Sequence, residues 1–260
     1  MSAVSGAVSA EWLKVRSVWS TYVVLLVPLA AVAFALVLDL YATVVWDHLL
    51  PVSRPGYTTM MTQAITVPLT EIAAGVFGVL AITSEYATGQ IRASLTVSPR
   101  RGLLLAAKSP VVGVVALVFG LVAVGTASLV GRAIIGDRVA ARPELGRELV
   151  LLAASGAAVM VFALLGLALG VLLRSTAGAI VVVAVVWYPL PMIAQWLPAP
   201  WNVRMTSVVP MNLPAEISGY HVPGPPPGLL SAPVAACVLA AYAVVPLAAA
   251  YAVFTRRDIR

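Results

Sequence analysis

Hydrophobic residues gather in six long runs along the chain, and polar residues fall between these runs. The runs extend over about Thr21–Leu40, Ala64–Thr83, Val111–Gly131, Leu149–Leu173, Ala177–Leu197 and Leu230–Phe254. Each is about twenty residues long, the length that a helix needs to cross the hydrocarbon layer of a membrane. The runs are continuous rather than alternating between apolar and polar positions, which argues against a membrane β-barrel. The pattern predicts six transmembrane helices.

Composition supports the same class of protein. The chain has 260 residues, of which 61% are hydrophobic and only 10% are charged, whereas soluble domains carry about 25% charged residues. We therefore expect an all-α, polytopic membrane protein. The net charge of +6 does not indicate nucleic-acid binding, because the basic residues lie at the ends of the predicted spans, where they control topology.

Six crossings place both termini on one side of the membrane. If that side is the cytoplasm, it holds ten basic residues: Lys14, Arg16, Arg92, Arg100, Arg101, Lys108, Arg174, Arg256, Arg257 and Arg260. The outer side then holds six: Arg54, Arg132, Arg138, Arg142, Arg147 and Arg204. Cytoplasmic loops carry the excess of Lys and Arg, so we expect both termini to be cytoplasmic. Usage rich in alanine and arginine and poor in lysine suggests the cell membrane of a GC-rich bacterium.

The predicted spans divide the chain into three regions. Residues 1–20 precede the first span, residues 21–254 form the transmembrane domain, and residues 255–260 form a cytoplasmic tail. The outer loops are 41–63, 132–148 and 198–229, and the last of these is rich in proline and glycine. We expect short helical turns on the outer membrane surface there, because prolines break longer helices.

The segment EWLKVRSVWSTY before the first span is predicted to be an amphipathic helix. On a helix, Trp12, Val15, Trp19 and Tyr22 fall on one stripe, with Lys14 on the opposite side. Tryptophans on such a stripe suit the headgroup layer of a membrane. We expect an interfacial helix on the cytoplasmic leaflet that includes Trp12, Lys14, Arg16 and Trp19; the alternative is a simple aromatic anchor for the first span.

The polar stretch TSEYATGQIRASLTVSPRRGLLLAAKSP, Thr83 to Pro110, separates the second and third spans. Ser84 is predicted to cap a short helix with Glu85 in its first turn. Ile91 and Leu95 then lie one turn apart and form a small apolar face. Ser98-Pro99 is typical of the start of another helix. A connection that only joined two spans would be shorter, so we expect a short helix bracketed by turns; the alternative is a solvated loop that follows the positive-inside rule.

Part of this stretch looks like a phosphate-binding loop but lacks the required chemistry. The segment GLLLAAKS, Gly102 to Ser109, resembles GxxxxGK[ST], but Ala107 replaces the second glycine and the leucine run favours a helix. A phosphate cradle needs an open loop of backbone N–H groups after a strand. We therefore expect no nucleotide or other cofactor on this chain.

With these features the chain resembles the permease subunits of the second type of ABC exporter. The resemblance rests on the amphipathic N-terminal helix, the six spans, the stretch SEYATGQIRASLTVSPRRGLLLAAK and the ending FTRRDIR. It implies a coupling helix in loop 84–108 that docks into a separate ATP-binding subunit. The implied contact residues are Glu85, Gly89, Gln90, Ile91, Arg92, Leu95 and Arg100. ATP and Mg would then belong to that partner, and a second permease subunit, identical or not, would complete the path.

Few polar residues lie inside the predicted spans. Glu71 is well inside the second span, where a carboxyl group usually faces a partner or a water-filled cavity; a cavity or gating role and a structural role remain equally open. Asp39 is expected at the outer interface. Pro189 and Pro191 are predicted to break or kink the fifth span, with gating or plain structure as the alternatives. Gly166 and Gly170 form a GxxxG motif that indicates close helix packing.

Other functional classes find less support. His48 and His221 have no companion at metal-ligand spacing, so no metal site is expected. No HExxH or GxSxG motif indicates an intramembrane enzyme, and we expect no catalytic site. An ion-coupled secondary transporter would need charged residues deep in several spans. A non-transporting assembly subunit remains an alternative, and the cargo cannot be read from the sequence.

Overall fold

The computed structural model describes residues 3–50, 61–89, 101–136, 138, 144–219 and 230–256. Within these ranges every regular element is a helix. The helices are α1 Ala3–Ser17, α2 Trp19–His48, α3 Met61–Ala87, α5 Arg101–Ile135, α6 Leu145–Leu173, α7 Thr176–Trp187, α8 Pro189–Trp196, α9 Trp201–Val208, the 3-10 helix η2 Pro210–Asn212, α10 Leu213–Ser218 and α11 Ala232–Arg256. The predicted all-α fold is confirmed.

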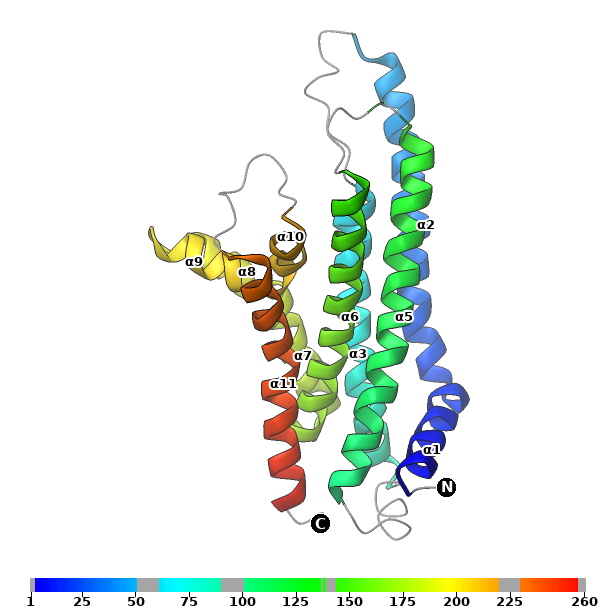
Figure 1. Cartoon of the computed structure of the whole chain (residues 1–260). Helices are drawn as coiled ribbons and strands as arrows, with labels where there is room; N and C mark the ends of the chain where they lie inside the picture. The colour runs from blue at the N-terminus through cyan, green and yellow to red at the C-terminus, as the bar shows by residue number, and fades with distance from the viewer. Residues whose placement is uncertain are drawn as a thin grey trace.

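Six helical segments are long and apolar enough to cross a membrane, as predicted. They are Thr21–His48, Ile65–Ala87, Gly102–Ile135, Leu145–Leu173, Thr176–Trp196 and Ala232–Arg256. The start of α1 and the end of α11 lie at the same end of the bundle, which we call the terminal end; the other end is the far end (Figure 1). An even number of crossings produces this arrangement.

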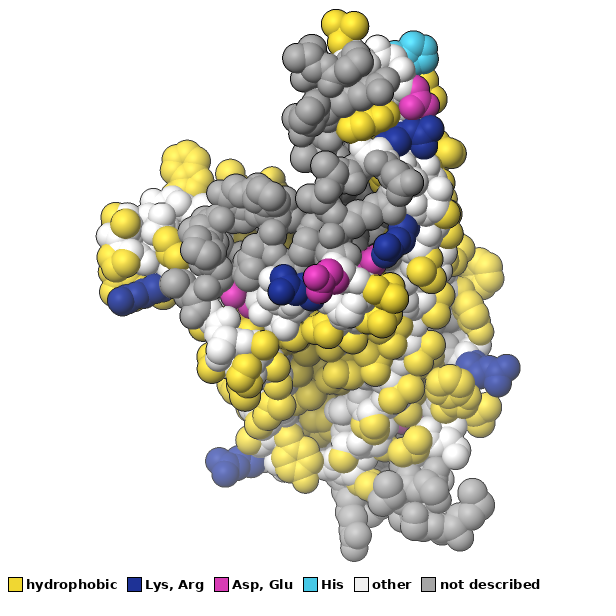
Figure 2. All heavy atoms as spheres, turned by 45° about the horizontal axis from the view of Figure 1, so that its top comes forward, with side chains coloured by type: hydrophobic (Ala, Val, Ile, Leu, Met, Phe, Trp, Pro, Cys, Tyr) yellow, Lys and Arg dark blue, Asp and Glu magenta, His cyan; other side chains and the backbone are white. Residues whose placement is uncertain are grey.

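The α6 helix occupies the centre of the bundle. It packs against α3, α5, α7, α10 and α11, and 67% of its most apolar window is buried, against 22% for α11. Figure 2 shows the outer surface of one face as a broad field of hydrophobic side chains, with most charged side chains at its margins. Such a surface is expected where lipid is the solvent.

Small residues allow α3 and α6 to approach closely. A Cβ added at Gly166 would collide with the carbonyl oxygen of Gly75, and one at Gly78 would collide with the carbonyl oxygen of Ala163. A Cβ at Gly170 would lie 2.6 Å from a side-chain carbon of Ile82. The predicted packing role of the GxxxG motif is therefore confirmed, and the contact lies within one subunit. Close backbone approach is the usual use of such motifs.

The N-terminal helix is separate from the first span, but the predicted stripe is not continuous. Val18 has extended backbone angles (φ −91°, ψ 117°) and separates α1 from α2. Trp12 therefore lies on one helix, and Trp19 and Tyr22 lie on the next; all three are exposed. Val15 instead packs against the main hydrophobic core. The helical projection was wrong beyond Ser17 because it assumed one axis.

The first span is longer than its apolar run suggested, and Asp39 is buried within it. The α2 helix continues to His48, so Asp39 is nine residues from its end. This residue is fully buried, with 0% exposure. Burial among helices does not give a depth in the membrane, so the place of Asp39 at the outer interface stays a prediction. The apolar run had placed the end of the span near Leu40, whereas the helix continues to His48.

The segment between the fifth and sixth spans has short helices, as expected. The α9, η2 and α10 helices follow one another between Trp201 and Ser218, and α10 packs against α6 and α11. In Figure 1, α9 projects sideways from the far end of the bundle. The prolines of this segment keep each helix short, because Pro has no N–H for the helical hydrogen bond and favours the first turn.

Candidate functional site

The predicted coupling residues lie only partly in the described structure. Glu85 and Gly89 are described, at the end of α3. The other five, Gln90, Ile91, Arg92, Leu95 and Arg100, lie outside the described residues, so their role stays a prediction. The described residues nevertheless show what holds the two ends of this segment, because α3 leads into it and α5 begins directly after it at Arg101.

The prediction that Ser84 caps a short helix is wrong. The α3 helix runs through Ser84 to Ala87, and the Ser84 hydroxyl donates back to the Leu80 carbonyl at 2.7 Å. Ser84 therefore does not cap a new helix, and Glu85 lies in the last turn of α3. The helix ends where Gly89 adopts a left-handed conformation (φ +71°), as glycines commonly do after a helix. Gly89, rather than Ser84, marks the boundary of the helix.

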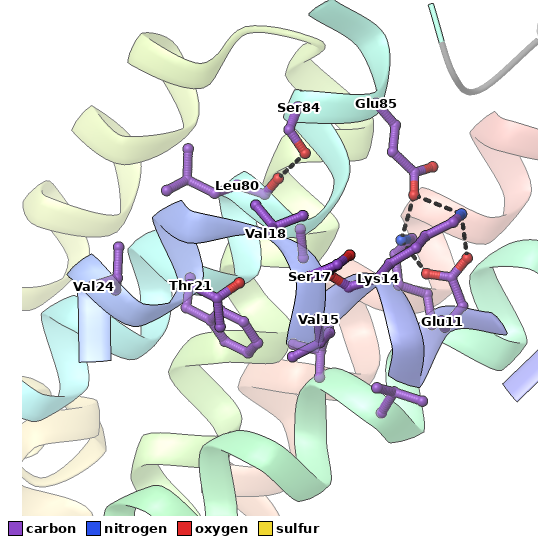
Figure 3. Close-up of a pocket in the computed structure, with 15 residues that line it drawn as sticks. Glu11, Lys14, Val15, Ser17, Val18, Thr21, Val24, Leu80, Ser84 and Glu85 are labelled. Atoms are coloured by element: carbon purple, nitrogen blue, oxygen red, sulfur yellow. Dashed lines mark hydrogen bonds and ion pairs between the residues drawn. The ribbon is translucent and has the colours of Figure 1, made fainter. Parts of the chain in front are cut away.

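Four charged side chains from three helices meet at the terminal end. Glu11 and Lys14 come from α1, Glu85 from α3 and Lys108 from α5, and we call this group the elbow cluster. Lys108 Nζ lies 2.9 Å from Glu85 Oε1 and also pairs with Glu11 Oε2. Lys14 Nζ lies 2.7 Å from Glu11 Oε1 and 3.0 Å from Glu85 Oε1. Figure 3 shows these bonds converging beside the α1–α2 break.

Burial makes the elbow cluster energetically important. Glu11, Glu85 and Lys108 are each only 3% exposed, and the two carboxylates balance the two ammonium groups. Removing one partner from a buried ion pair leaves an uncompensated charge, which is far more costly than losing an exposed pair. Glu85 Oε1 accepts from both lysines, so this single atom joins α3 to α1 and α5.

The pKa of Lys14 reflects its surroundings. Partial burial lowers the pKa of this ammonium group, but hydrogen bonds to Glu11 and Glu85 outweigh that effect and hold the pKa above its usual value. The folded chain therefore gains stability from charged Lys14 at every pH below about 10, and loses it only as the pH rises through the raised pKa. Lys14 is therefore charged at physiological pH.

Sequence reasoning missed the elbow cluster as a unit. It placed Lys14 on an interfacial helix and Glu85 and Lys108 in a loop, and it gave Glu11 no role. The spacing of Glu11 and Lys14, three residues apart on a helix, was a visible sign of a local ion pair. The pairing of Glu11 with Lys108 spans 97 positions, and no local pattern indicates it.

A pocket of about 120 Å³ lies beside the elbow cluster. The hydroxyl-bearing residues Ser17, Thr21 and Ser84 line it together with the cluster, and its apolar side includes Phe77 and Val111. The pocket lies between the α1–α2 break, α3 and α5 (Figure 3). These three elements are therefore joined by charges on one side and leave a small space on the other.

The remaining residues of the predicted interfacial helix lie outside this junction. Trp12 is 44% exposed and Trp19 is 78% exposed. Arg16 is exposed, and its carbonyl oxygen accepts a hydrogen bond from the Tyr22 hydroxyl at 2.7 Å. Exposed tryptophans next to a basic residue are typical of a membrane–water boundary. Only Lys14, of the four predicted residues, joins the elbow cluster.

Glu71 links the second span to the fifth. Its side chain is 1% exposed, and its Oε2 accepts a hydrogen bond from Trp187 Nε1 at 2.8 Å. Its other oxygen has no hydrogen-bond partner among the described residues. Trp187 is the last residue of α7, and its ring stacks with Tyr188 at a centroid distance of 6.1 Å. This hydrogen bond adds to the apolar packing of α3 against α7 and lies at the point where the fifth span is interrupted.

The predicted break at Pro189 and Pro191 is confirmed. The α7 helix ends at Trp187 and α8 begins at Pro189. Pro28 and Pro68, in contrast, lie within continuous helices. Two prolines within three residues remove two helical donors close together, which explains why only the fifth span is divided.

We expect a Trp187→Phe variant to unfold at a lower temperature than the wild-type chain. The change removes the indole donor and leaves both oxygens of Glu71 buried without a hydrogen-bond partner among the described residues, at a cost of about 1–3 kcal/mol. A Glu71→Gln variant retains an oxygen that accepts from Trp187 and should unfold close to the wild-type midpoint. Thermal unfolding of the purified chain measures both. Equal midpoints for Trp187→Phe and the wild type would show that the bond does not contribute to stability.

Among the described residues, no group of three or more His, Cys, Asp or Glu side chains is placed to hold a metal ion. At the far end, Arg132 pairs with Glu148, and Arg138 forms an exposed pair with Asp47 at 3.1 Å. The first pair joins α5 to α6, and the second joins the segment after α5 to α2. They are separate from the elbow cluster at the opposite end.

Comparison with known proteins finds a family match over most of the chain. Residues 11–259 match the family described as ABC-2 family transporter protein. The match begins at Glu11, the first residue of the elbow cluster, and covers all six candidate spans. A search of the curated proteins finds no match.

Proposed function

Because the chain belongs to the ABC-2 transporter family, we propose that it is the membrane-spanning permease subunit of an ATP-driven exporter. It is a multi-pass membrane protein and a transport component rather than an enzyme in its own right. ATP and Mg bind a separate ATP-binding subunit, and the terminal end of the bundle faces the cytoplasm of a bacterial cell. The excess of Lys and Arg at that end supports this orientation.

The elbow cluster is the observation that carries the proposal. It joins α1, α3 and α5 at the base of the segment between Gly89 and Arg101, where the docking residues are predicted. A force applied to that segment reaches α3 and α5 directly through the backbone, and it reaches α1 through Lys14 and Glu11. Rigid, buried ion pairs transmit displacement better than an exposed loop, because each side chain is held by two partners.

The mechanism that follows is mechanical. Closure of two ATP-binding subunits pulls the docked segments together, and each permease subunit passes the movement to its spans. A path between two permease subunits then changes its opening. The α7–α8 and α11 segments support a role in contacts outside the chain, because each buries only 22% of its apolar window within it. Lipids and the second permease subunit, identical or not, would cover these surfaces.

The proposal predicts that the segment after Gly89 can be disconnected without unfolding the chain. We expect Arg92→Glu, or Ile91→Asp combined with Leu95→Asp, to reduce ATP-dependent transport at least about tenfold, the effect of losing 1.4 kcal/mol of docking energy. A charge placed in an apolar contact lacks a partner and opposes docking. Transport into inverted vesicles that contain both subunits measures the effect, once a cargo has been found by substrate screening.

A control variant and a binding measurement accompany this test. Arg204→Glu is the matched control, because Arg204 is exposed on α9 at the far end and its reversal should leave transport unchanged. Affinity purification of the tagged wild-type chain should recover an ATP-binding protein whose ATPase rate changes on association, whereas the docking variants should lose it. Full transport by the docking variants, or labelling of cysteines introduced at Arg92 from outside the cell, would contradict the proposal.

A further inference from the structure

Asp39 is a buried acid that the proposed mechanism does not use. It lies on α2 with 0% exposure, and neither carboxyl oxygen has a hydrogen-bond partner among the described residues. An isolated carboxylate inside a membrane protein is strongly unfavourable. Intramembrane acids normally pair with a charge or face an ion pathway. Asp39 therefore needs a source of positive charge.

The helices around Asp39 bury further polar groups at the same level. Thr21 on α2 and Ser84 on α3 line the same pocket, and α2 and α3 run in opposite directions (Figure 1). Asp39 is eighteen residues beyond Thr21, and Thr66 is eighteen residues before Ser84. At 1.5 Å per residue both lie about 27 Å from that pocket along the bundle. Their helices pack against each other, and both residues are 0% exposed.

Thr66 differs from the other buried hydroxyl groups of α3. Thr70 and Thr83 donate to the carbonyl four residues earlier, at 2.6 Å and 3.0 Å, as Ser and Thr usually do in membrane helices. The hydroxyl of Thr66 has no hydrogen-bond partner among the described residues. An unpaired hydroxyl and an unpaired carboxyl group thus lie at one level of two packed helices.

The charged side chains of the neighbouring helices are engaged elsewhere. On α3, Glu71 accepts from Trp187 and Glu85 belongs to the elbow cluster. On α5, which also packs against α2, Lys108 belongs to the elbow cluster and Arg132 pairs with Glu148. None of these described groups forms an ion pair with Asp39.

We propose that Asp39 and Thr66 form an intramembrane site for one monovalent cation, either a proton or Na⁺, between α2 and α3. Carboxyl and hydroxyl oxygens are hard ligands that suit such cations. The bound cation neutralises Asp39 and so stabilises the packing of the two helices. The site is independent of ATP-driven transport and of the elbow cluster, which lies at the opposite end of the same helices.

Thermal unfolding of the purified full chain tests the site. Midpoints are measured by tryptophan fluorescence between acidic and alkaline pH, in NaCl and in choline chloride. We expect the wild-type midpoint in choline to fall by several degrees as pH rises, because loss of the proton leaves a bare buried carboxylate. Asp39→Asn should abolish this dependence, and Thr66→Val should reduce any response to Na⁺. Asp47→Asn, on the same helix but at an exposed position, is the matched control and should behave as wild type.

The outcomes are distinguishable. Recovery of the wild-type midpoint by Na⁺ at alkaline pH identifies Na⁺ as the occupant, whereas a fall that is the same in both salts identifies a proton. An identical dependence on pH and Na⁺ in wild type and Asp39→Asn would overturn the proposal. If Asp39→Asn does not fold, a hydrophobic carbodiimide provides the second measurement on the wild type. Mass spectrometry should then detect the adduct on Asp39 at acidic pH and lose it at alkaline pH; absence at every pH would also overturn the site.

Discussion

A Lys108→Met variant is expected to lose about 3–5 kcal/mol of stability, the usual cost of breaking a buried ion pair by removing one partner. Methionine fills a similar volume, so the change chiefly removes charge. Lys108 is 3% exposed and is bonded to Glu11 and Glu85. Without it, two buried carboxylates share the single ammonium group of Lys14. Thermal unfolding of the purified chain measures the loss.

Two further variants separate charge from packing. Arg16→Met, an exposed position on the same helix as Glu11, is the control and should leave the midpoint unchanged. Adding Glu85→Gln to Lys108→Met restores a balance of one carboxylate and one ammonium group, and should recover part of the loss. Lys14→Met should cost less than Lys108→Met, because the Lys14 side chain is 35% exposed and water replaces part of what is lost. A double variant less stable than Lys108→Met alone would contradict the charge argument.

Adding one methyl group at Gly166 is expected to destabilise the chain by at least about 1–3 kcal/mol, the usual cost of overpacking a core. A Cβ there meets the carbonyl oxygen of Gly75, and backbone cannot move aside as a side-chain tip can. The α3 and α6 helices would have to separate along their whole contact. Gly166→Ala should therefore lower the unfolding midpoint and increase the fraction of protein that aggregates on extraction.

The matched control is expected to have the opposite effect on stability. A Cβ added at Gly125, within α5, would have no heavy atom of another residue within 4 Å, so Gly125→Ala meets open space. Alanine favours a helix by up to about 1 kcal/mol over glycine, and this variant should be as stable as the wild type or more so. Opposite effects of the same chemical change would isolate the helix contact as the cause. A Gly166→Ala variant with a wild-type midpoint would show that the helices can adjust at no cost.

Much of the fold could be predicted because each membrane span corresponds to a continuous hydrophobic run in the sequence. The six spans, the division of the fifth span at Pro189 and Pro191, and the close packing at Gly166 and Gly170 all follow from local composition. In each case the physical constraint acts on neighbouring residues: bilayer thickness, a missing N–H donor, or the absence of a side chain. Constraints of this kind can be recognised within a short stretch of the sequence.

The candidate site was harder to predict because it depends on contacts between distant segments. Glu11 and Lys108 meet only because the chain bends at Val18 and α1 packs against α5. The complete burial of Asp39 was not predicted, because it depends on the packing of α2 against other helices. Ser84 was misread because a serine before a glutamate looks like a helix start wherever it occurs, and only the hydrogen bond to Leu80 shows otherwise.

The position of Glu85 Oε1 restricts how α3 can move relative to its neighbours. Glu85 Oε1 receives bonds from lysines on two different helices, so any sideways displacement of α3 stretches at least one of them. We therefore expect α1, α3 and α5 to move together at the terminal end. We therefore expect relative movement of the spans to occur away from this junction, as at the division of the fifth span between Trp187 and Pro189.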